Sequence, residues 1–309
     1  MEKSVVMAVY NGEKYIIEQL TSIYNQSIPV QEVWICDDQS SDSTVAIVKE
    51  FIKSHHLEKN WTIIQNEKNI GYANNFMKAL QYSTKELIFF CDQDDIWKKD
   101  RVQKMEKVME EHTNVNVLGS EFTPFCAEKH ARRVPEWELK QMKQDGSLEP
   151  VEFIDSNIFI GAQGCTMCVR KSFVDKILPY WHEDWAYDEF LWKLALCEQS
   201  LYMLHESTLK RREHASNTSL QKMHKISTRV KFLEDLYASH KGTIQYAKAC
   251  GCSSRQLDLL EKNKKATRLR IELFTKKKIW NTIPLALFYL NCYHKKRAIL
   301  RELVMAIRG

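Results

Sequence analysis

The length, composition and charge of the chain indicate a folded globular protein with a distinct carboxyl-terminal part. Its 309 residues, 44% hydrophobic and 28% charged, exclude a disordered or fibrous chain and are enough for one large domain or two smaller ones. The formal net charge of +5 hides an acidic part, residues 1–221, and a basic part, residues 222–309, which has twenty Lys and Arg against six Asp and Glu.

Strand-like and helix-like segments alternate over the first 115 residues. Short apolar runs are each followed by a stretch with helical periodicity. In chain order, we expect strand 4–9, helix 13–25, strand 32–36, helix 42–55, strand 61–65, helix 74–82, strand 86–91 and helix 100–112. Repeated βα units with short connections imply an α/β fold with a doubly wound, mostly parallel sheet that is covered on both faces.

Polar residues gather where three of these strands end. Tyr10-Asn11-Gly12 follows the first strand, the segment from Asp37 to Asp42 follows the second, and the segment from Asp92 to Asp95 follows the fourth. Ligands of open α/β sheets bind at the carboxyl ends of strands, and hard divalent cations prefer carboxylate oxygens. Since the sequence has neither a G-x-G-x-x-G motif nor a P-loop, we expect a metal ion and acidic residues to hold phosphates there.

Each acidic cluster also has a purely structural interpretation. The acids from 92 to 95 can cap the helix that is expected to open near Lys99. The acids at 37 and 38 can form an Asx-turn and cap the next helix, for which the segment from Ser40 to Thr44 is suited. The residue pattern alone leaves these alternatives open.

Four motifs follow one another in a specific order and spacing. They are Val5–Gly12, Val33–Asp42, Asn69–Gly71 and Asp92–Trp97. Together they resemble the successive motifs of family 2 glycosyltransferases with the GT-A fold. The likeness continues through residues 157–170 and 188–217 and is most marked towards bacterial rhamnosyltransferase-like members. The resemblance implies a GT-A domain over residues 1–220, with a nucleotide-sugar-binding half (1–115) and an acceptor and catalytic half (116–220), and leaves 221–309 as a helical basic extension.

The resemblance also implies which residues bind the donor, a nucleoside-diphosphate sugar. The residues expected to line the nucleoside pocket are Ala8, Tyr10, Glu13, Asp37, Asp38 and Gly71, with the acidic pair hydrogen-bonded to base and ribose. Arg212 and His214 are expected to face the diphosphate, because a guanidinium suits phosphate oxygens and a histidine can donate to them or join a metal site. Arg211 stands where the family usually has a tyrosine.

Asp92-Gln93-Asp94 resembles the DxD motif of the family. In that motif the second acid reaches the divalent ion on the diphosphate and the first lies nearer the ribose. We therefore expect Asp94 to be the first metal ligand and Asp92 to bind both metal and donor, with Mg²⁺ or Mn²⁺ as the cofactor. Asp95 is expected to bind acceptor or to hold the loop.

Inversion at the anomeric carbon needs one carboxylate to take the proton of the acceptor hydroxyl. Rhamnosyltransferase-like members carry His-Asp before an apolar helix, and here the matching pair is Tyr187-Asp188, so the histidine is replaced. Asp188 is the expected base. Glu189, Asp184 and Glu183 remain alternatives, and Asp188 can instead merely cap the helix that follows it.

These features predict an inverting, metal-dependent transferase. It would move a sugar, with rhamnose as one candidate, to a saccharide or lipid-linked acceptor in cell-surface polysaccharide biosynthesis. Two other classes stay open: a sugar nucleotidyltransferase, although the basic glycine-rich loop expected after its first strand is missing, and a non-catalytic nucleotide-binding or membrane adaptor.

The ends of the chain bear on where the protein acts. The amino terminus lacks the apolar core of a signal peptide, the nine cysteines form no CxxC pair, and the apolar stretch 280–293 is too short to span a bilayer. We therefore expect a cytoplasmic protein. Its basic carboxyl-terminal region suits an anionic membrane surface and peripheral attachment, or is the charged face of ordinary helices. Nucleic acid is not an expected partner, because no recognition motif accompanies the charge.

Overall fold

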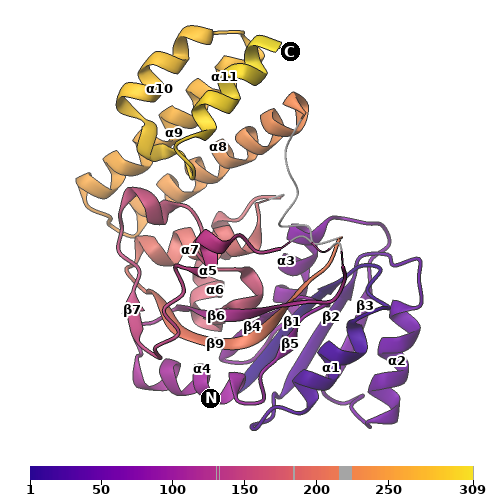
Figure 1. Cartoon of the computed structure of the whole chain (residues 1–309). Coiled ribbons are helices and arrows are strands. Elements are labelled where there is room, and N and C mark those ends of the chain that lie inside the picture. Colours follow the sequence, from indigo (N-terminus) through magenta and orange to yellow (C-terminus); the bar gives the residue numbers. More distant parts are fainter. Residues whose placement is uncertain (130, 132, 184, 216–224, 309) are drawn as a thin grey trace.

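A mixed sheet of nine strands forms the centre of the part of the chain that the structure describes (Figure 1). This computed structural model describes residues 1–129, 131, 133–183, 185–215 and 225–308. The strand order is β3-β2-β1-β4-β8-β6-β9-β5, and β7 pairs with β9 beside this path. The expected α/β fold is confirmed.

The first half of the sheet is parallel, as the alternating pattern predicts. Its strands β1 (Lys3–Val9), β2 (Glu32–Asp37), β3 (Trp61–Gln65) and β4 (Leu87–Cys91) alternate with helices α1 (Ile16–Tyr24), α2 (Thr44–Ser54) and α3 (Tyr72–Tyr82). The first helix begins three residues later than expected, because Gly12 to Tyr15 form a turn in which the Tyr15 amide donates to the Gly12 carbonyl. The other boundaries lie within two residues of their predicted positions.

Antiparallel pairs appear in the second half. Strand β8 (Cys168–Arg170) runs antiparallel between β4 and β6 (Val117–Cys126), and β9 (Leu201–Glu213) runs parallel to β6. The short strands β5 (Ile96–Trp97) and β7 (Leu148–Pro150) are both antiparallel to β9. The helices of this half are α4 (Arg101–Glu111), α5 (Glu136–Leu139), α6 (Lys171–Ile177) and α7 (Tyr187–Cys197), with single 3₁₀ turns η1 (Asp155–Ile158), η2 (Gly164–Thr166) and η3 (Leu178–Tyr180).

Helices cover both faces of the sheet, and alternate residues of each strand point to opposite faces, so both sets of side chains are buried. Val6 and Phe90 pack with residues of α3 and α7 on one face. Val5, Met7 and Phe89 pack with residues of α1, α2 and α4 on the other. This double burial explains why the central strands read as continuous apolar runs.

The carboxyl-terminal part is helical and lies beyond α7, at the end of the molecule away from β1 to β3 (Figure 1). It consists of α8 (Ile226–Ala249), α9 (Ser254–Thr275), η5 (Ile279–Asn281), α10 (Thr282–Phe288), η6 (Leu290–Cys292) and α11 (Ala298–Arg308). Ser253 and Gln256 form a capping box that starts α9. Among the described residues, no helix is long and apolar enough to cross a membrane.

One buried carboxylate joins three of these helices. Glu302 of α11 is 1% exposed and accepts hydrogen bonds from Arg270 of α9 at 2.7 and 3.0 Å and from Arg229 Nε of α8 at 2.8 Å. These two guanidinium groups hold the pKa of Glu302 below its ordinary value against the effect of burial, which raises it. The carboxylate therefore stays charged and acts as an electrostatic link between α8, α9 and α11.

We expect Glu302→Ala to lower the free energy of unfolding by about 3 to 5 kcal/mol, because it leaves buried guanidinium groups without their counter-charge. Urea denaturation of the full chain followed by circular dichroism measures this change. Glu234→Ala, which removes an exposed acid of α8, is the matched control and should change the unfolding free energy by less than about 0.5 kcal/mol. Equal effects of the two substitutions would contradict the linking role of Glu302.

Candidate active site

The acidic turn from Asp92 to Asp95 lies between β4 and β5, at the carboxyl end of the parallel strands. Strand β5 separates the turn from α4, whose N-cap residue is Asp100. The capping alternative for the acids at 92 to 95 therefore fails. The turn is instead packed under β9, the strand that carries Arg211 and Arg212.

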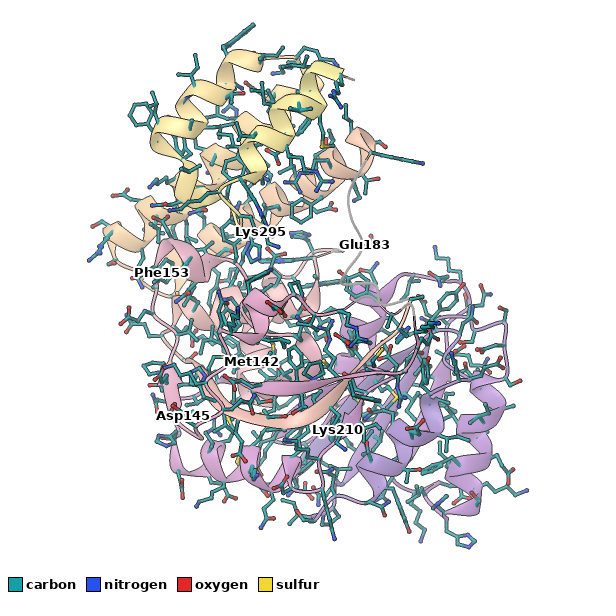
Figure 2. The ribbon with its side chains drawn as sticks, in the orientation of Figure 1. Met142, Asp145, Phe153, Glu183, Lys210 and Lys295 are labelled. Carbon is teal, nitrogen blue, oxygen red and sulfur yellow. The ribbon has the colours of Figure 1, made fainter. Side chains whose placement is uncertain are left out.

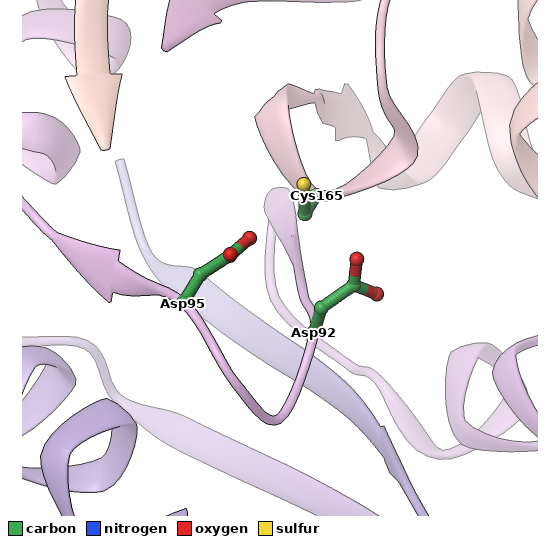
Figure 3. Close-up of side chains that lie close together, drawn as sticks. All are labelled: Asp92, Asp95 and Cys165. Atoms are coloured by element: carbon green, nitrogen blue, oxygen red, sulfur yellow. The ribbon is translucent and has the colours of Figure 1, made fainter. Parts of the chain in front are cut away.

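Asp92 and Asp95 stand on the two sides of the turn and point towards Cys165 of η2 (Figure 3). One ligand atom from each of the three side chains lies within 4.8 Å of the others. Burial raises the pKa of Asp92 to about 7, with the carboxylate of Asp94 adding to the effect and Arg211 opposing it. Burial and the neighbouring Asp94 and Asp92 likewise raise the pKa of Asp95 well above its ordinary value. The carboxylates of Asp92, Asp94 and Asp95 therefore repel one another when all three are ionised, and nearby positive charge is needed to stabilise that state.

Asp94 points the other way and pairs with His214. Its Oδ2 lies 2.7 Å from His214 Nε2, and the imidazole packs against the ring of Tyr15 with centroids 5.2 Å apart. Arg212 reinforces this contact, since its Nε donates to the Asp94 carbonyl at 2.7 Å. Asp94 is therefore in contact with both His214 and Arg212 in the structure, while the expected roles of the three residues towards metal and diphosphate remain predictions.

Arg212 is held as a positioning group. Its guanidinium lies between the rings of Tyr15 and Phe125, 4.4 and 4.6 Å from their centroids, and donates to Glu18 Oε2 at 3.0 Å. Its backbone amide donates to Asp95 Oδ1 at 2.9 Å. Arg212 therefore holds the acidic turn at two points, the backbone carbonyl of Asp94 and the buried carboxylate of Asp95.

Sequence reasoning missed three residues of this site. Arg211 is buried, and its charge lowers the pKa of Asp92 and Asp95, so it is a cation that faces the turn from β9. Cys165 lies in η2, within residues 157–170, for which the sequence indicated a family likeness but no role. Arg101 of α4 donates to the Cys165 carbonyl at 2.9 Å and so places η2 over the turn. Arg211 could have been found from the sequence, because it stands where the family usually has a tyrosine. Nothing in the sequence pattern points to Arg101.

Gln93 connects the acidic turn to the loop after β1. Its side-chain amide accepts from the Tyr10 amide at 2.8 Å and donates to the Tyr10 carbonyl at 3.0 Å. Gly12 lies directly against it, since a Cβ at residue 12 would come 2.5 Å from Gln93 Oε1. The ring of Tyr10 is 49% exposed beside this contact, and Ala8 is half-buried in β1, two residues earlier.

Asp37 and Asp38 are both buried and both hold loops. Asp38 accepts from Asn66 Nδ2 at 2.9 Å and from the Ile70 and Gly71 amides at 2.8 and 2.9 Å. Asp37 accepts from the Ser40 amide at 3.1 Å. Both acids thus hold loops, but neither caps α2, whose N-cap residue is Ser43, and a contact with base or ribose remains a prediction.

Glu13 and Gly71 lie in loops at the carboxyl edge of the sheet, before α1 and at the start of α3. Glu13 Oε2 accepts from the amide of Ser43, the N-cap residue of α2, at 2.9 Å. Gly71 is the N-cap residue of α3 and has φ +82°, a conformation that residues with a Cβ rarely adopt. Both therefore shape the loops around the predicted nucleoside pocket.

Asp188 is half-buried in the first turn of α7. Its Oδ1 accepts from the Glu189 amide at 2.8 Å. Burial raises the pKa of Asp188 to about 6, the Glu189 amide lowers it, and the Glu189 carboxylate adds to the rise. The charge of Asp188 in turn raises the pKa of Asp92, so the two carboxylates interact electrostatically.

Two of the three alternative bases lie in the described part of the chain. Glu189 pairs with the buried Lys193 at 2.5 Å and accepts from Ser239 of α8 at 2.9 Å, so it fastens α7 to α8. Glu183 is exposed on the loop before α7 (Figure 2). Asp184 lies outside the described residues, as do residues 216 and 217 of the motif that follows Arg211.

The tyrosine that replaces the usual histidine is part of the core. Tyr187 stacks on Phe90 and packs against Phe76, with ring centroids 4.8 and 4.1 Å apart. A Cβ at Gly164 would lie 2.0 Å from the Tyr187 hydroxyl, which explains the glycine there. Burial, together with Asp92 and Asp188, raises the pKa of the Tyr187 hydroxyl well above its ordinary value. The Tyr187 hydroxyl therefore stays neutral, and it lies directly against Gly164.

The donor set fits a hard divalent cation. Three acids crowd one turn, and Asp95 Oδ2 is buried without a hydrogen-bond donor among the described residues. Burial and the nearby acids Asp95 and Asp92 raise the pKa of Cys165 well above its ordinary value, so this sulfur stays a thiol. Carboxylate oxygens such as those of Asp92 and Asp95 are ligands that Mg²⁺ and Mn²⁺ prefer, and a neutral thiol is not; Asp94 is not part of this group of ligand atoms.

Residues 4–176 match the model of glycosyl transferase family 2, which is more than half of the chain. The chain belongs to this family. The expected family membership is thereby confirmed, and the match favours a glycosyltransferase over a nucleotidyltransferase.

Two curated relatives illustrate the similarity. The chain is 32% identical to the putative glycosyltransferase EpsE of Bacillus subtilis over 122 residues, which is 40% of this chain and 43% of EpsE. It is 40% identical to the dTDP-rhamnosyl transferase RfbG of Shigella flexneri over 101 residues, which is 31% of this chain and 34% of RfbG. The alignments thus span less than half the length of either relative.

Solved structures share the fold over nearly the whole chain. Residues 1–349 of TarS from Staphylococcus aureus, in complex with UDP-GlcNAc, superpose with a TM-score of 0.69 and 18% identity, over 100% of this chain and 89% of that one. The mannosyltransferase PcManGT of Pyrobaculum calidifontis, in complex with GDP-Man and Mn²⁺, gives a TM-score of 0.58 and 16% identity, over 99% and 86%. At these identities the likeness establishes the GT-A fold.

Because Asp38 holds the loop of residues 66 to 71, we expect its substitution to destabilise the protein even without ligand. We expect Asp38→Asn to lower the unfolding free energy of the ligand-free protein by about 1 to 3 kcal/mol, because one amide donor would then face an NH₂ group. Thermal denaturation measures it. The control Glu67→Gln changes an exposed acid of the same loop and should leave the melting temperature unchanged. An unaltered melting temperature for Asp38→Asn would indicate that the carboxylate serves ligand alone.

Proposed function

We propose that the protein is an inverting, metal-dependent glycosyltransferase. It would transfer a sugar from a nucleoside-diphosphate sugar to a saccharide or lipid-linked acceptor in cell-surface polysaccharide biosynthesis. The observation that supports the proposal is that α7, which carries Asp188, packs on the end of β4 through the stacked rings of Tyr187 and Phe90, close enough for Asp188 to raise the pKa of Asp92 in the acidic turn. One group can serve the acceptor while the others serve the leaving diphosphate.

The acidic turn supplies the donor side of the proposed site. Asp94 and Asp92 would hold a divalent ion, with Asp95 as a further buried carboxylate beside them. When bound, this ion neutralises charge on the diphosphate as it leaves. His214 and Arg212 keep Asp94 in place, and Arg211 adds positive charge beside the turn. Ala8, Tyr10, Glu13, Asp37, Asp38 and Gly71 are proposed to surround the nucleoside.

Asp188 supplies the acceptor side. Its carboxylate would take the proton of the acceptor hydroxyl while that oxygen forms a bond to the anomeric carbon. The bond from this carbon to the diphosphate oxygen breaks on the opposite face, so the configuration inverts. A pKa of about 6 leaves Asp188 ionised at neutral pH but basic enough to accept a proton.

The remaining features are also part of the proposal. We assign residues 1–220 to the catalytic domain, divided near residue 115, and residues 221–309 to a carboxyl-terminal extension. The names of the relatives suggest dTDP-rhamnose and UDP-GlcNAc as first donors to test, since RfbG is described as a dTDP-rhamnosyl transferase and TarS was solved with UDP-GlcNAc. The excess of Lys and Arg in residues 222–309 supports a peripheral location on the inner face of the cell membrane.

A pair of isosteric substitutions tests the two halves of the site. We expect Asp94→Asn to weaken Mn²⁺-dependent binding of nucleoside diphosphates at least about tenfold, because it removes a charged metal ligand. Asp188→Asn should bind them as the native protein does and lose at least about 100-fold in transfer rate, because it removes the base. Thermal stabilisation by UDP, GDP and dTDP with Mn²⁺ measures binding, and radiolabelled sugar transfer measures turnover.

Glu183→Gln is the control for Asp188→Asn, because it neutralises an exposed acid of the preceding loop. It should retain both binding and transfer. Equal loss of diphosphate binding in Asp94→Asn and Asp188→Asn would refute the separate roles. A folded native protein that none of the nucleoside diphosphates stabilises would refute the function itself.

The raised pKa of Asp188 predicts the acid limb of the pH profile. A base works only when ionised, so the transfer rate should fall about tenfold per pH unit below a midpoint near pH 6, where the carboxylate becomes protonated. The measurement is the maximal rate between pH 5 and 8 at saturating donor and metal. A rate that stays constant down to pH 5 would exclude Asp188 as the base.

A further inference from the structure

Two helices near the carboxyl terminus expose rows of large apolar side chains. Trp280, Ile283 and Leu287 are 65%, 63% and 69% exposed, and their spacing places them on one face of η5 and α10. Phe288 beside them is 66% exposed. We call these residues, together with those of α11 described next, the apolar face.

Helix α11 contributes the second row. Leu300, Val304 and Ile307 recur at i, i+4 and i+7 and are all exposed. The opposite side of α11 is filled by Ile299, which packs in the core of the helical region. Helix α10 contacts α11, and both contact η5, so the two rows lie on neighbouring segments (Figure 1).

The apolar face is not an unfinished core. Leu285 of α10 is fully buried and packs with Ile299 and Tyr293. Each helix therefore already has an inner apolar side that stabilises the fold. The outer rows are additional, and contiguous exposed apolar surface of this kind is typical of an interaction site.

Positive charge surrounds the apolar face. Residues 276–308 include eight basic residues, Lys276, Lys277, Lys278, Lys295, Lys296, Arg297, Arg301 and Arg308. The single acid in this range, Glu302, is buried and paired with Arg229 and Arg270. Glu272 of α9 offsets part of this charge, since it pairs with Lys276 and Lys278 at 3.4 and 3.0 Å, but the net charge of residues 272–308 remains positive.

Charge and helix length together indicate which partner binds the apolar face. A second copy of the same face would bring two cationic rims together, which like-charge repulsion opposes. The seven residues of α10 and eleven of α11 are too short to span a bilayer. An apolar row flanked by Lys and Arg on short helices matches an interfacial element that lies flat on anionic lipid.

We infer that the apolar face docks on an anionic bilayer, with Trp280, Leu287 and Phe288 entering the headgroup region while the surrounding Lys and Arg contact lipid phosphates. This deepens the proposed peripheral location by identifying the contact surface and by adding apolar insertion to charge attraction. It does not depend on which donor is used.

The docked orientation would bring the acceptor half towards the membrane. Lys295, in the loop between η6 and α11, lies where the helical region meets the rest of the chain (Figure 2). Its Nζ is 4.4 Å from the ring centroid of Trp137 of α5, and His294 packs against Phe159 at 5.9 Å. The basic loop thus also contacts Trp137 and Phe159, which belong to the proposed acceptor half. Docking would therefore hold that half near lipid-linked acceptors, a consequence that rests on the proposed function.

Vesicle flotation of the full chain tests the inference. The native protein should float with vesicles of phosphatidylcholine and phosphatidylglycerol and much less with phosphatidylcholine alone. Leu287→Glu should reduce the partition coefficient at least about tenfold, because it places a charge in the inserted row. Lys296→Gln/Arg297→Gln should reduce binding to anionic vesicles and weaken its salt dependence.

The matched control is Ile17→Glu, the same kind of change at an exposed position of α1. It should float as the native protein does. Equal flotation of Leu287→Glu and Ile17→Glu would overturn the inference, as would a native protein that does not float with anionic vesicles. A dimer in size-exclusion chromatography that Leu287→Glu converts to a monomer, without vesicle binding, would reassign the face to self-association.

Diphosphate binding without vesicles separates this inference from the proposed function. Leu287→Glu should be stabilised by nucleoside diphosphate and Mn²⁺ as strongly as the native protein. Flotation without any diphosphate binding would retain the docking surface and reject the transferase.

Discussion

The fold of the site depends on how three acids are accommodated in one turn. Buried carboxylates repel one another, and burial alone makes each of them costly to ionise. Strand β9 offsets this cost by presenting Arg211, Arg212 and His214 to the turn after β4. The parallel pairing of β6 with β9, far from β4 in strand order, therefore has an electrostatic purpose as well as a structural one. The divalent cation proposed for this site would add to the same neutralisation.

Several of the predicted ligand-binding residues also hold the framework. Asp38, Glu13 and Arg212 each accept or donate bonds that fix a loop or a helix start. Such double use keeps the loops at the carboxyl edge of the sheet in one arrangement, which lowers the entropic cost of arranging a ligand between them. The helical region is built on the same principle, since the buried Glu302 joins three helices and leaves their outer sides available for lipid.

Much of the fold could be read from the sequence because the first four strands are buried on both faces and alternate with amphipathic helices. Strand β5 and the antiparallel β8 could not, since two or three residues carry no periodic signal and their pairing is decided by distant partners. The acidic motif indicated the correct sheet edge, and the arginine at 211 was visible but uninterpreted. The contacts of Asp38 with residues 66 to 71, and of Tyr187 with Gly164, arise only when segments far apart in sequence meet.

The amide of Gln93 has a consequence for how ligands are sensed. Because it bonds both the amide and the carbonyl of Tyr10, the loop after β1 and the turn after β4 are mechanically one piece. A ligand group that displaces either loop must displace the other or break both bonds. A ligand that restrains one of the two segments would therefore also restrain the other through this side chain.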